Sequence, residues 1–195
     1  VLYVGMGGLG KSRLSMQVAA MASDAYPDGI WFVPLETVRD PALVGPTIAR
    51  TLGLTDSLTR PAADAIIDAI MDRQVLFVLD NFEQVIGAGS LVADLLRHCP
   101  RLTAIVTTRV ALRVSGEQEY PVPGLPSPPD TRQLSEMERL NLPRGLRDGA
   151  LETVRTFEAV RLFVSRATAV RPGFVLTDAN APAVGITMAL QFAPP

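Results

Sequence analysis

The chain has 195 residues, of which 48% are hydrophobic and 19% charged, and its formal net charge is −2. Lys11 is the only lysine and no dense basic run occurs, so nothing in the composition indicates a nucleic-acid-binding surface. The apolar runs, such as residues 75–79, are far shorter than the roughly 20 residues of a membrane-spanning helix, which leaves a soluble α/β domain as the expected class.

The single cysteine, Cys99, excludes an internal disulfide and fits a reducing compartment, so we expect a cytoplasmic location. No signal-like segment opens the chain. The sequence begins at Val1, already inside an expected strand, and ends on Pro194 and Pro195 without a closing element. We therefore interpret it as a fragment of a longer protein.

The first twelve residues contain the motif that dominates the sequence. Residues 1–4 are mostly β-branched or aromatic and residues 11–22 favour a helix, so the intervening glycines lie between a strand and a helix. The pattern G-x-x-x-x-G-K-[ST] is met by Gly5, Gly10, Lys11 and Ser12. This context predicts a phosphate-binding loop.

Each residue type in this loop has a physical role. Glycines adopt positive φ and let the backbone N–H groups from about Gly8 onward point at one phosphate, aided by the positive end of the following helix. Lys11 would reach the β- and γ-phosphates, and the Ser12 hydroxyl would complete the shell of a Mg²⁺ ion. The nucleotide-binding residues that we expect are Gly5, Gly7, Gly8, Leu9, Gly10, Lys11, Ser12 and Arg13.

Further elements follow in order. Residues 30–33 read as a second, buried strand with Trp31 in the core. Asp40 and Pro41 predict the N-cap and first position of a helix that extends to Gly53. A helix over residues 61–73 places three carboxylates on one face, which we interpret as a solvated surface rather than a metal site: Asp64, Asp68 and Asp72.

The second chemical feature is the apolar strand expected at residues 75–80. It ends in Asp80, at the sheet edge where open α/β folds bind ligands, and a carboxylate there can hold Mg²⁺ through water. Many ATPases carry an acidic residue directly after this aspartate, whereas Asn81 occupies that position here. Glu83 is then the nearest candidate for a general base, with a surface residue or helix cap as the alternative.

A helix around residues 91–96 and a strand at residues 102–106 come next. The strand ends in Thr107, Thr108 and Arg109, which should reach the same ligand edge, where they could respond to a γ-phosphate. His98 and Cys99 are too few for a zinc site.

The rest of the chain predicts an edge and a small helical part. A proline-broken edge strand is expected at residues 120–126. Residues 158–169 predict a helix, and another begins near Asp178 or Asn180. The domains expected are a P-loop NTPase core at residues 1–126, a connector at residues 127–156 and a partial helical subdomain at residues 157–195.

Five motifs resemble, in order and spacing, those of the NB-ARC-like STAND ATPases: residues 5–12, 79–83, 107–109, 120–123 and 158–163. The chain is most similar to the bacterial branch found in large regulators with LuxR-type or SARP-type DNA-binding domains or cyclase domains. The similarity covers residues 1–126 and resumes over residues 157–184.

The resemblance implies a doubly wound, parallel, five-stranded P-loop NTPase sheet with helices on both faces, plus the start of a helical subdomain. It also implies a switch that holds ADP at rest and ATP with Mg²⁺ when active, that slow hydrolysis resets, and that self-associates in the full-length protein. By matched position, Asp80 would be the Walker B acid and Arg109 the γ-phosphate sensor. The catalytic residues expected are Lys11, Asp80, Glu83 and Arg109, and the metal ligands are Ser12 and Asp80.

Two other functions stay open. Asn81 and the segment at residues 185–192, which differs from the Gly-Leu-Pro-Leu segment of the family, are compatible with a non-catalytic, truncated nucleotide-binding fragment. A P-loop kinase acting on a small molecule would need a basic lid, for which the connector offers Arg132, Arg139, Arg144 and Arg147. In each case the expected partner is a nucleotide, with neither a membrane nor direct contact with nucleic acid.

Overall fold

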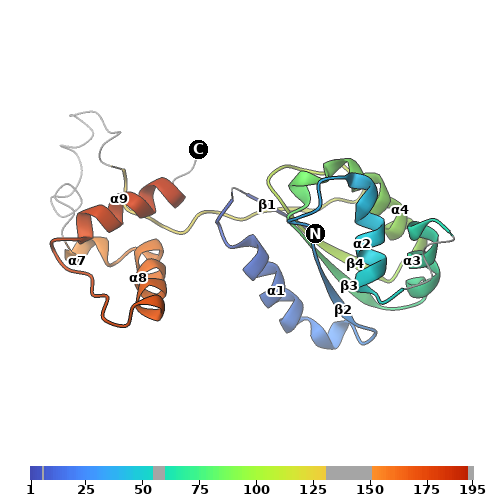
Figure 1. Cartoon of the computed structure of the whole chain (residues 1–195), viewed down its shortest axis with the longest axis horizontal. Coiled ribbons are helices and arrows are strands. Elements are labelled where there is room, and N and C mark those ends of the chain that lie inside the picture. Colours follow the sequence, from blue (N-terminus) through green and yellow to red (C-terminus); the bar gives the residue numbers. More distant parts are fainter. Residues whose placement is uncertain (6, 55–59, 131–150, 193–195) are drawn as a thin grey trace. The chain divides into compact units, whose positions relative to one another are not determined.

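The computed structural model describes residues 1–5, 7–54, 60–130 and 151–192. The chain forms two compact units, Val1–Val122 and Pro123–Pro195. The first unit contains a sheet with helices and the second is helical (Figure 1). Most of the expected connector, including Arg132, Arg139, Arg144 and Arg147, lies outside the described residues.

The first unit is organised around one parallel sheet of five strands in the order β2-β3-β4-β1-β5. These strands are β1 (Leu2–Val4), β2 (Ile30–Pro34), β3 (Val75–Asp80), β4 (Leu102–Thr108) and β5 (Glu119–Pro121). Because every pair is parallel, all five carboxyl ends meet at one edge of the sheet. The predicted five-stranded parallel P-loop NTPase sheet is confirmed.

Burial within the sheet follows the position of each strand. β3 lies between two neighbours and is buried along its whole length, as its unbroken apolar sequence predicts. The prediction that β2 is buried was wrong: β2 is an edge strand, and Phe32 is 37% exposed. Trp31 of β2 packs as expected against the core, with its ring centroid 6.2 Å from that of Phe77.

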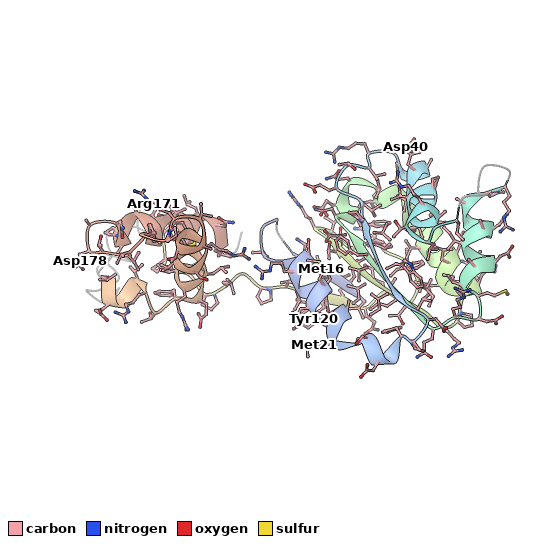
Figure 2. The ribbon with its side chains drawn as sticks, turned by 60° about the horizontal axis from the view of Figure 1, so that its bottom comes forward. Met16, Met21, Asp40, Tyr120, Arg171 and Asp178 are labelled. Atoms are coloured by element: carbon pink, nitrogen blue, oxygen red, sulfur yellow. The ribbon has the colours of Figure 1, made fainter. Side chains whose placement is uncertain are left out.

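Helices cover both faces of this sheet (Figure 1). Helix α1 (Lys11–Met21) packs on one face, where Ala19 joins Tyr3 and Ile105 in a small core. Three helices pack on the other face, over a larger core: α2 (Val44–Thr51), α3 (Ala62–Ile70) and α4 (Gly89–His98). Some apolar side chains remain exposed on the α1 side, namely Met16, Met21 and Tyr120 (Figure 2).

The helix predicted to begin at Asp40 and Pro41 does so through its capping chemistry. The Asp40 carboxylate accepts a 2.9 Å hydrogen bond from the backbone N–H of Ala42, and Pro41 occupies the first position. The first turn, Pro41–Leu43, is a 3₁₀ helix that leads directly into α2. The short helical turns η1 (Ser23–Ala25), η3 (Phe82–Gln84) and η4 (Ile86–Ala88) complete this unit.

Side chains tie together the amino-terminal ends of three strands, at the edge opposite the phosphate loop. Asp28, just before β2, accepts a 2.7 Å hydrogen bond from the backbone N–H of Gln74, just before β3. The amide oxygen of Gln74 accepts a 2.7 Å bond from Arg101, just before β4. These polar bonds fix the relative starting points of β2, β3 and β4.

The described part of the second unit contains helices α7 (Leu151–Val154), α8 (Glu158–Val170) and α9 (Ala181–Phe192). Its small core is built from one buried face of each helix, including Val154, Val160 and Met188. Helix α9 begins directly after Asn180, one of the two residues expected to cap it. The Asn180 side chain bonds to the preceding turn instead: Oδ1 accepts from the backbone N–H of Thr177, and Nδ2 donates to the carbonyl of Val175. None of the helices in the described ranges has the length and hydropathy needed to span a bilayer.

Candidate functional site

The glycine-rich loop joins β1 to α1 at the carboxyl edge of the sheet. Gly8 and Gly10 have φ angles of 83° and 84°, a left-handed conformation that side chains with a Cβ atom rarely adopt. Gly10 immediately precedes α1, and its carbonyl accepts the first helical bond from Leu14 at 2.9 Å. The backbone therefore makes the strand-turn-helix connection that the motif requires.

Lys11 is the most buried charged group of this loop. It is 8% exposed, and its Nζ donates a 2.7 Å hydrogen bond to the carbonyl oxygen of Gly5. Burial lowers the pKa of the Lys11 ammonium, the nearby Glu83 and Asp80 carboxylates oppose that shift, and Arg109 adds to it. Lys11 is thus held at the loop in the field of all three charged groups.

The neighbouring loop positions are less enclosed. Ser12 and Leu9 are half-buried, whereas Gly7 and Arg13 are exposed. The carbonyl of Ser12 accepts a 2.8 Å bond from the fully buried hydroxyl of Ser15, which fixes the first turn of α1.

Asp80 ends β3 at this edge and is 6% exposed. Its Oδ1 accepts a 2.5 Å hydrogen bond from the Thr107 hydroxyl of β4. Thr107 Oγ1 in turn accepts a 3.0 Å bond from the backbone N–H of Asn81. A buried carboxylate is thereby held in one orientation by the adjacent strand.

Asn81 turns the chain sharply after β3. Its φ of 62° is left-handed, a conformation that asparagine tolerates better than most residues. The turn is followed by η3, which contains Glu83. The turn thereby places Glu83 in η3, where its carboxylate meets Arg109.

Glu83 forms an ion pair with Arg109, the residue that follows β4. The distance between Arg109 Nε and Glu83 Oε1 is 3.1 Å. Within the described residues, the second oxygen, Oε2, is buried and accepts no hydrogen bond. The guanidinium itself is mostly exposed.

Arg109 also lies directly against the phosphate loop. A Cβ atom added to Gly7 would lie 2.9 Å from Nη2 and 3.3 Å from Cζ of Arg109. A side chain at position 7 would therefore displace the guanidinium. Gly7 provides the space that Arg109 occupies.

The structure thus brings Lys11, Asp80, Glu83 and Arg109 together around the loop, at the ends of β1, β3 and β4. Two relationships had no part in the sequence analysis: the bond from Thr107 to Asp80, and the packing of Arg109 on Gly7. The first could have been anticipated from strand register, because β3 and β4 pair with Leu79 opposite Val106. The arrangement combines a cation, an oriented acid and a partly desolvated carboxylate, which is the set of groups that phosphoryl transfer uses.

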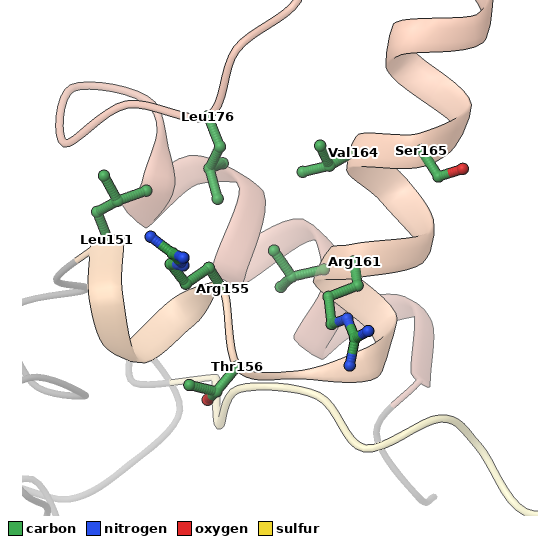
Figure 3. Close-up of a pocket in the computed structure, with 8 residues that line it drawn as sticks. Leu151, Arg155, Thr156, Arg161, Val164, Ser165 and Leu176 are labelled. Carbon is green, nitrogen blue, oxygen red and sulfur yellow. The ribbon is translucent and has the colours of Figure 1, made fainter.

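A separate cavity of about 610 Å³ lies in the second unit, between the end of α7 and α8 (Figure 3). Its walls are mainly apolar, with polar groups from Arg155, Arg161, Thr156 and Ser165. Arg155 is paired with Glu152 at 2.9 Å. Val160 and Arg161, which line this cavity, belong to the motif at residues 158–163, but none of the candidate nucleotide-binding or catalytic residues does so.

The strand order, the left-handed glycines before α1 and the acid at the end of β3 define a P-loop NTPase fold.

No family model matches the chain. A Mycobacterium tuberculosis H37Rv protein named as an HTH-type transcriptional regulator is 34% identical over 202 residues, covering 99% of this chain and 20% of that protein. An uncharacterized protein of the same organism is 32% identical over 186 residues, covering 95% of this chain and 40% of that protein. The chain therefore spans a fifth to two fifths of the length of these relatives.

The regulatory protein AfsR of Streptomyces griseus is 32% identical over 116 residues, which cover 55% of this chain and 12% of AfsR. Among solved structures, Cdc6p from Pyrobaculum aerophilum matches 88% of this chain and 56% of its own, with 13% identity and a TM-score of 0.49.

Proposed function

We propose that this chain is an ATP- and ADP-binding switch module, with slow ATP hydrolysis, of a larger transcriptional or signalling regulator of the NB-ARC-like STAND class. The observation that carries the proposal is the convergence of Lys11, Asp80 and the Glu83–Arg109 pair on one glycine loop. The regulatory part is supported by one relative named as an HTH-type transcriptional regulator and one named as a regulatory protein, and the chain spans a small part of each. The LuxR-type or SARP-type assignment of the full-length protein belongs to the same proposal.

The described residues fit a magnesium nucleotide. Gly10 has no side chain, is exposed and has no other group within 4 Å of where a Cβ atom would lie, so a phosphate can approach the backbone there. Lys11 supplies a buried positive charge, and Asp80 is an oriented carboxylate of the kind that Mg²⁺ prefers. Ser12 is the remaining metal ligand in the proposal, at the start of α1.

Each residue has a distinct role in this proposal. Lys11 neutralises the β- and γ-phosphates, and Asp80 would hold Mg²⁺ together with Ser12. Mg²⁺, when bound, would supply charge neutralisation at the phosphate oxygens. Arg109 binds the γ-phosphate and so distinguishes ATP from ADP, while Glu83 accepts a proton from the attacking water.

The position of Glu83, the acidic residue nearest to Asp80 in the chain, supports slow hydrolysis in this proposal. Asn81 has no carboxylate, and Glu83 reaches the cluster through a left-handed residue and a short 3₁₀ turn. Glu83 is also engaged by an ion pair with Arg109. Slow hydrolysis suits a switch, because ATP must stay bound long enough for the regulator to self-associate and act.

The test is a titration of the purified chain with ATP and ADP, with and without Mg²⁺, followed by measurement of phosphate release over hours. We expect binding with slow release. Lys11→Ala should abolish binding, Asp80→Ala should weaken its Mg²⁺-dependent part, and Glu83→Gln should slow release while sparing binding. Unchanged ATP affinity in both Lys11→Ala and Asp80→Ala would overturn the site assignment.

A second candidate is a nucleotide holder that does not hydrolyse ATP. The absence of an acid at Asn81 and the engagement of Glu83 by Arg109 favour it. Binding without phosphate release would select it over the switch. The kinase alternative depends on arginines that lie outside the described residues.

A further inference from the structure

The Arg109 guanidinium lies between two parts of the candidate site. Its Nε is the atom bonded to Glu83, at 3.1 Å, whereas Nη2 is the atom nearest to the face of Gly7. A guanidinium is a flat fork with several donors in fixed directions, so it can hold two acceptors at once. One donor edge of Arg109 faces the base candidate, and another faces the loop where a phosphate would lie.

The two oxygens of the Glu83 carboxylate also differ in their partners. Oε1 accepts the bond from Arg109, while Oε2 is buried and accepts no bond from any described residue. Buried acceptors are nearly always satisfied in folded proteins, by protein groups or by water. An orphaned carboxylate oxygen in a charged cluster therefore marks the position of an additional hydrogen-bond donor, such as a water molecule.

An ordinary surface ion pair does not account for this geometry. In such a pair both partners are well exposed, as in Arg97 with Asp94, whose side chains are 67% and 49% exposed. In the Glu83–Arg109 pair the arginine side chain is 61% exposed, but the glutamate is only 16% exposed and the arginine packs on a loop glycine. The pair is therefore placed to orient Glu83 rather than to solubilise the surface.

We propose that Arg109 is a positioning residue for the base: its bond to Oε1 turns Oε2 of Glu83 toward the attacking water, while another of its donors bonds the γ-phosphate of ATP. This inference rests on the proposed function and deepens it. A simple γ-phosphate sensor affects only the preference for ATP over ADP. In this proposal the rate of hydrolysis also depends on the fork geometry of the Arg109 guanidinium.

The step balances as follows. Glu83 Oε2 accepts a proton from a water molecule as the water oxygen bonds to the γ-phosphorus. The bond between that phosphorus and the β,γ-bridging oxygen breaks, and ADP leaves with the electron pair. Arg109 keeps its bond to Glu83 Oε1, so Oε2 is the oxygen turned toward the water.

The test compares Arg109→Lys, Arg109→Ala, Glu83→Gln and the double variant Arg109→Ala with Glu83→Gln, using the surface change Arg97→Lys as a matched control. Lysine keeps the charge but cannot hold two acceptors in fork geometry. Arg109→Lys should therefore keep ATP affinity within about threefold and lose about ten- to a hundredfold in the single-turnover rate. Arg97→Lys should match the wild type in both measurements.

Two readouts separate positioning from a structural role. The double variant should hydrolyse ATP no more slowly than Glu83→Gln, because the two residues act as one unit. Guanidinium chloride at millimolar concentration should partly restore the rate of Arg109→Ala but not that of the double variant. Equal melting temperatures would show that all variants are folded.

Three outcomes would overturn the inference while leaving nucleotide binding intact. These are a wild-type rate in Arg109→Lys, independent and multiplying effects of Arg109→Ala and Glu83→Gln, and ATP binding by the wild type without any phosphate release. Failure of the wild-type chain to bind ATP would instead refute the proposed function itself. The two failures are therefore distinguishable.

Discussion

The hydroxyl of Thr107 donates a 2.5 Å hydrogen bond to Oδ1 of Asp80, across the contact between β4 and β3. Thr107 Oγ1 also accepts a 3.0 Å hydrogen bond from the backbone N–H of Asn81. The single proton of the Thr107 hydroxyl is therefore the one donated to Asp80. Asp80 must therefore act as an acceptor at Oδ1. The neighbouring strand sets the orientation of the acid on which the proposed metal site depends.

Removing this hydroxyl should weaken the Mg²⁺-dependent part of ATP binding. For Thr107→Val we expect a loss of about tenfold, or about 1.4 kcal/mol, because Asp80 loses its orienting donor. ATP titrations at fixed Mg²⁺ concentrations measure the effect. Thr107→Ser should retain most of the affinity, and Thr103→Val on the same strand should change nothing; an equal loss in Thr103→Val would contradict the assignment.

The buried ammonium of Lys11 predicts a pH dependence of nucleotide binding. Burial lowers its pKa below the ordinary value of 10.5, and only the protonated form attracts phosphate. Affinity should therefore fall as the pH rises toward 10.5, and a bound phosphate should raise the pKa again, so binding on the alkaline side takes up a proton. Calorimetry in buffers of different ionisation enthalpy detects that uptake.

Lys11→Arg is the matched control for this pH dependence, because arginine stays charged throughout the range. Any residual binding by this variant should be independent of pH on the alkaline side. A wild-type affinity that is flat up to pH 10.5, or the same slope in both proteins, would exclude Lys11 as the titrating group.

The left-handed turn at Asn81 predicts a strict side-chain preference. Asn81→Gly should leave the free energy of unfolding within about 1 kcal/mol of the wild type, since glycine adopts positive φ freely. Asn81→Val should lower it by about 1–3 kcal/mol, because a β-branched residue is strained there. Urea unfolding measures both, and equal stabilities would contradict the strain argument.

The two phenylalanines of neighbouring strands predict a stability contrast. Phe77→Ala on central β3 should lower the free energy of unfolding by about 3–5 kcal/mol, because its ring is 1% exposed and contacts Trp31. Phe32→Ala on edge strand β2 should cost about 1 kcal/mol. The difference between the two urea midpoints is the measurement, and similar losses would show that the edge is as tightly packed as the centre.

Local features of this fold could be predicted from the sequence because local chemistry determines them. The glycine loop, the apolar run ending in Asp80 and the cap at Asp40 each depend on residues close together in the chain. The exposure of Phe32 could not be predicted, because it depends on which strand lies at the sheet edge. The partners of the Asn180 side chain could not be predicted either, because several backbone groups within one turn compete for it.

Within the candidate site, residue types could be predicted more readily than their pairing. Arg109 and Glu83 were both singled out, but their ion pair depends on the left-handed turn at Asn81. Gly7 and Arg109 lie in loops that are far apart in the sequence, so no local sequence pattern predicts the contact between them.

The polar bonds among Asp28, Gln74 and Arg101 fix where β2, β3 and β4 begin. With the starting points fixed, the number of residues in each strand determines which residue reaches the far edge and which face it points to. One residue added to β3 would turn Asp80 to the opposite face and carry it past Thr107. This segment can therefore accept changes of apolar side chain far more readily than insertions or deletions, and its length is the property on which selection should act most strictly.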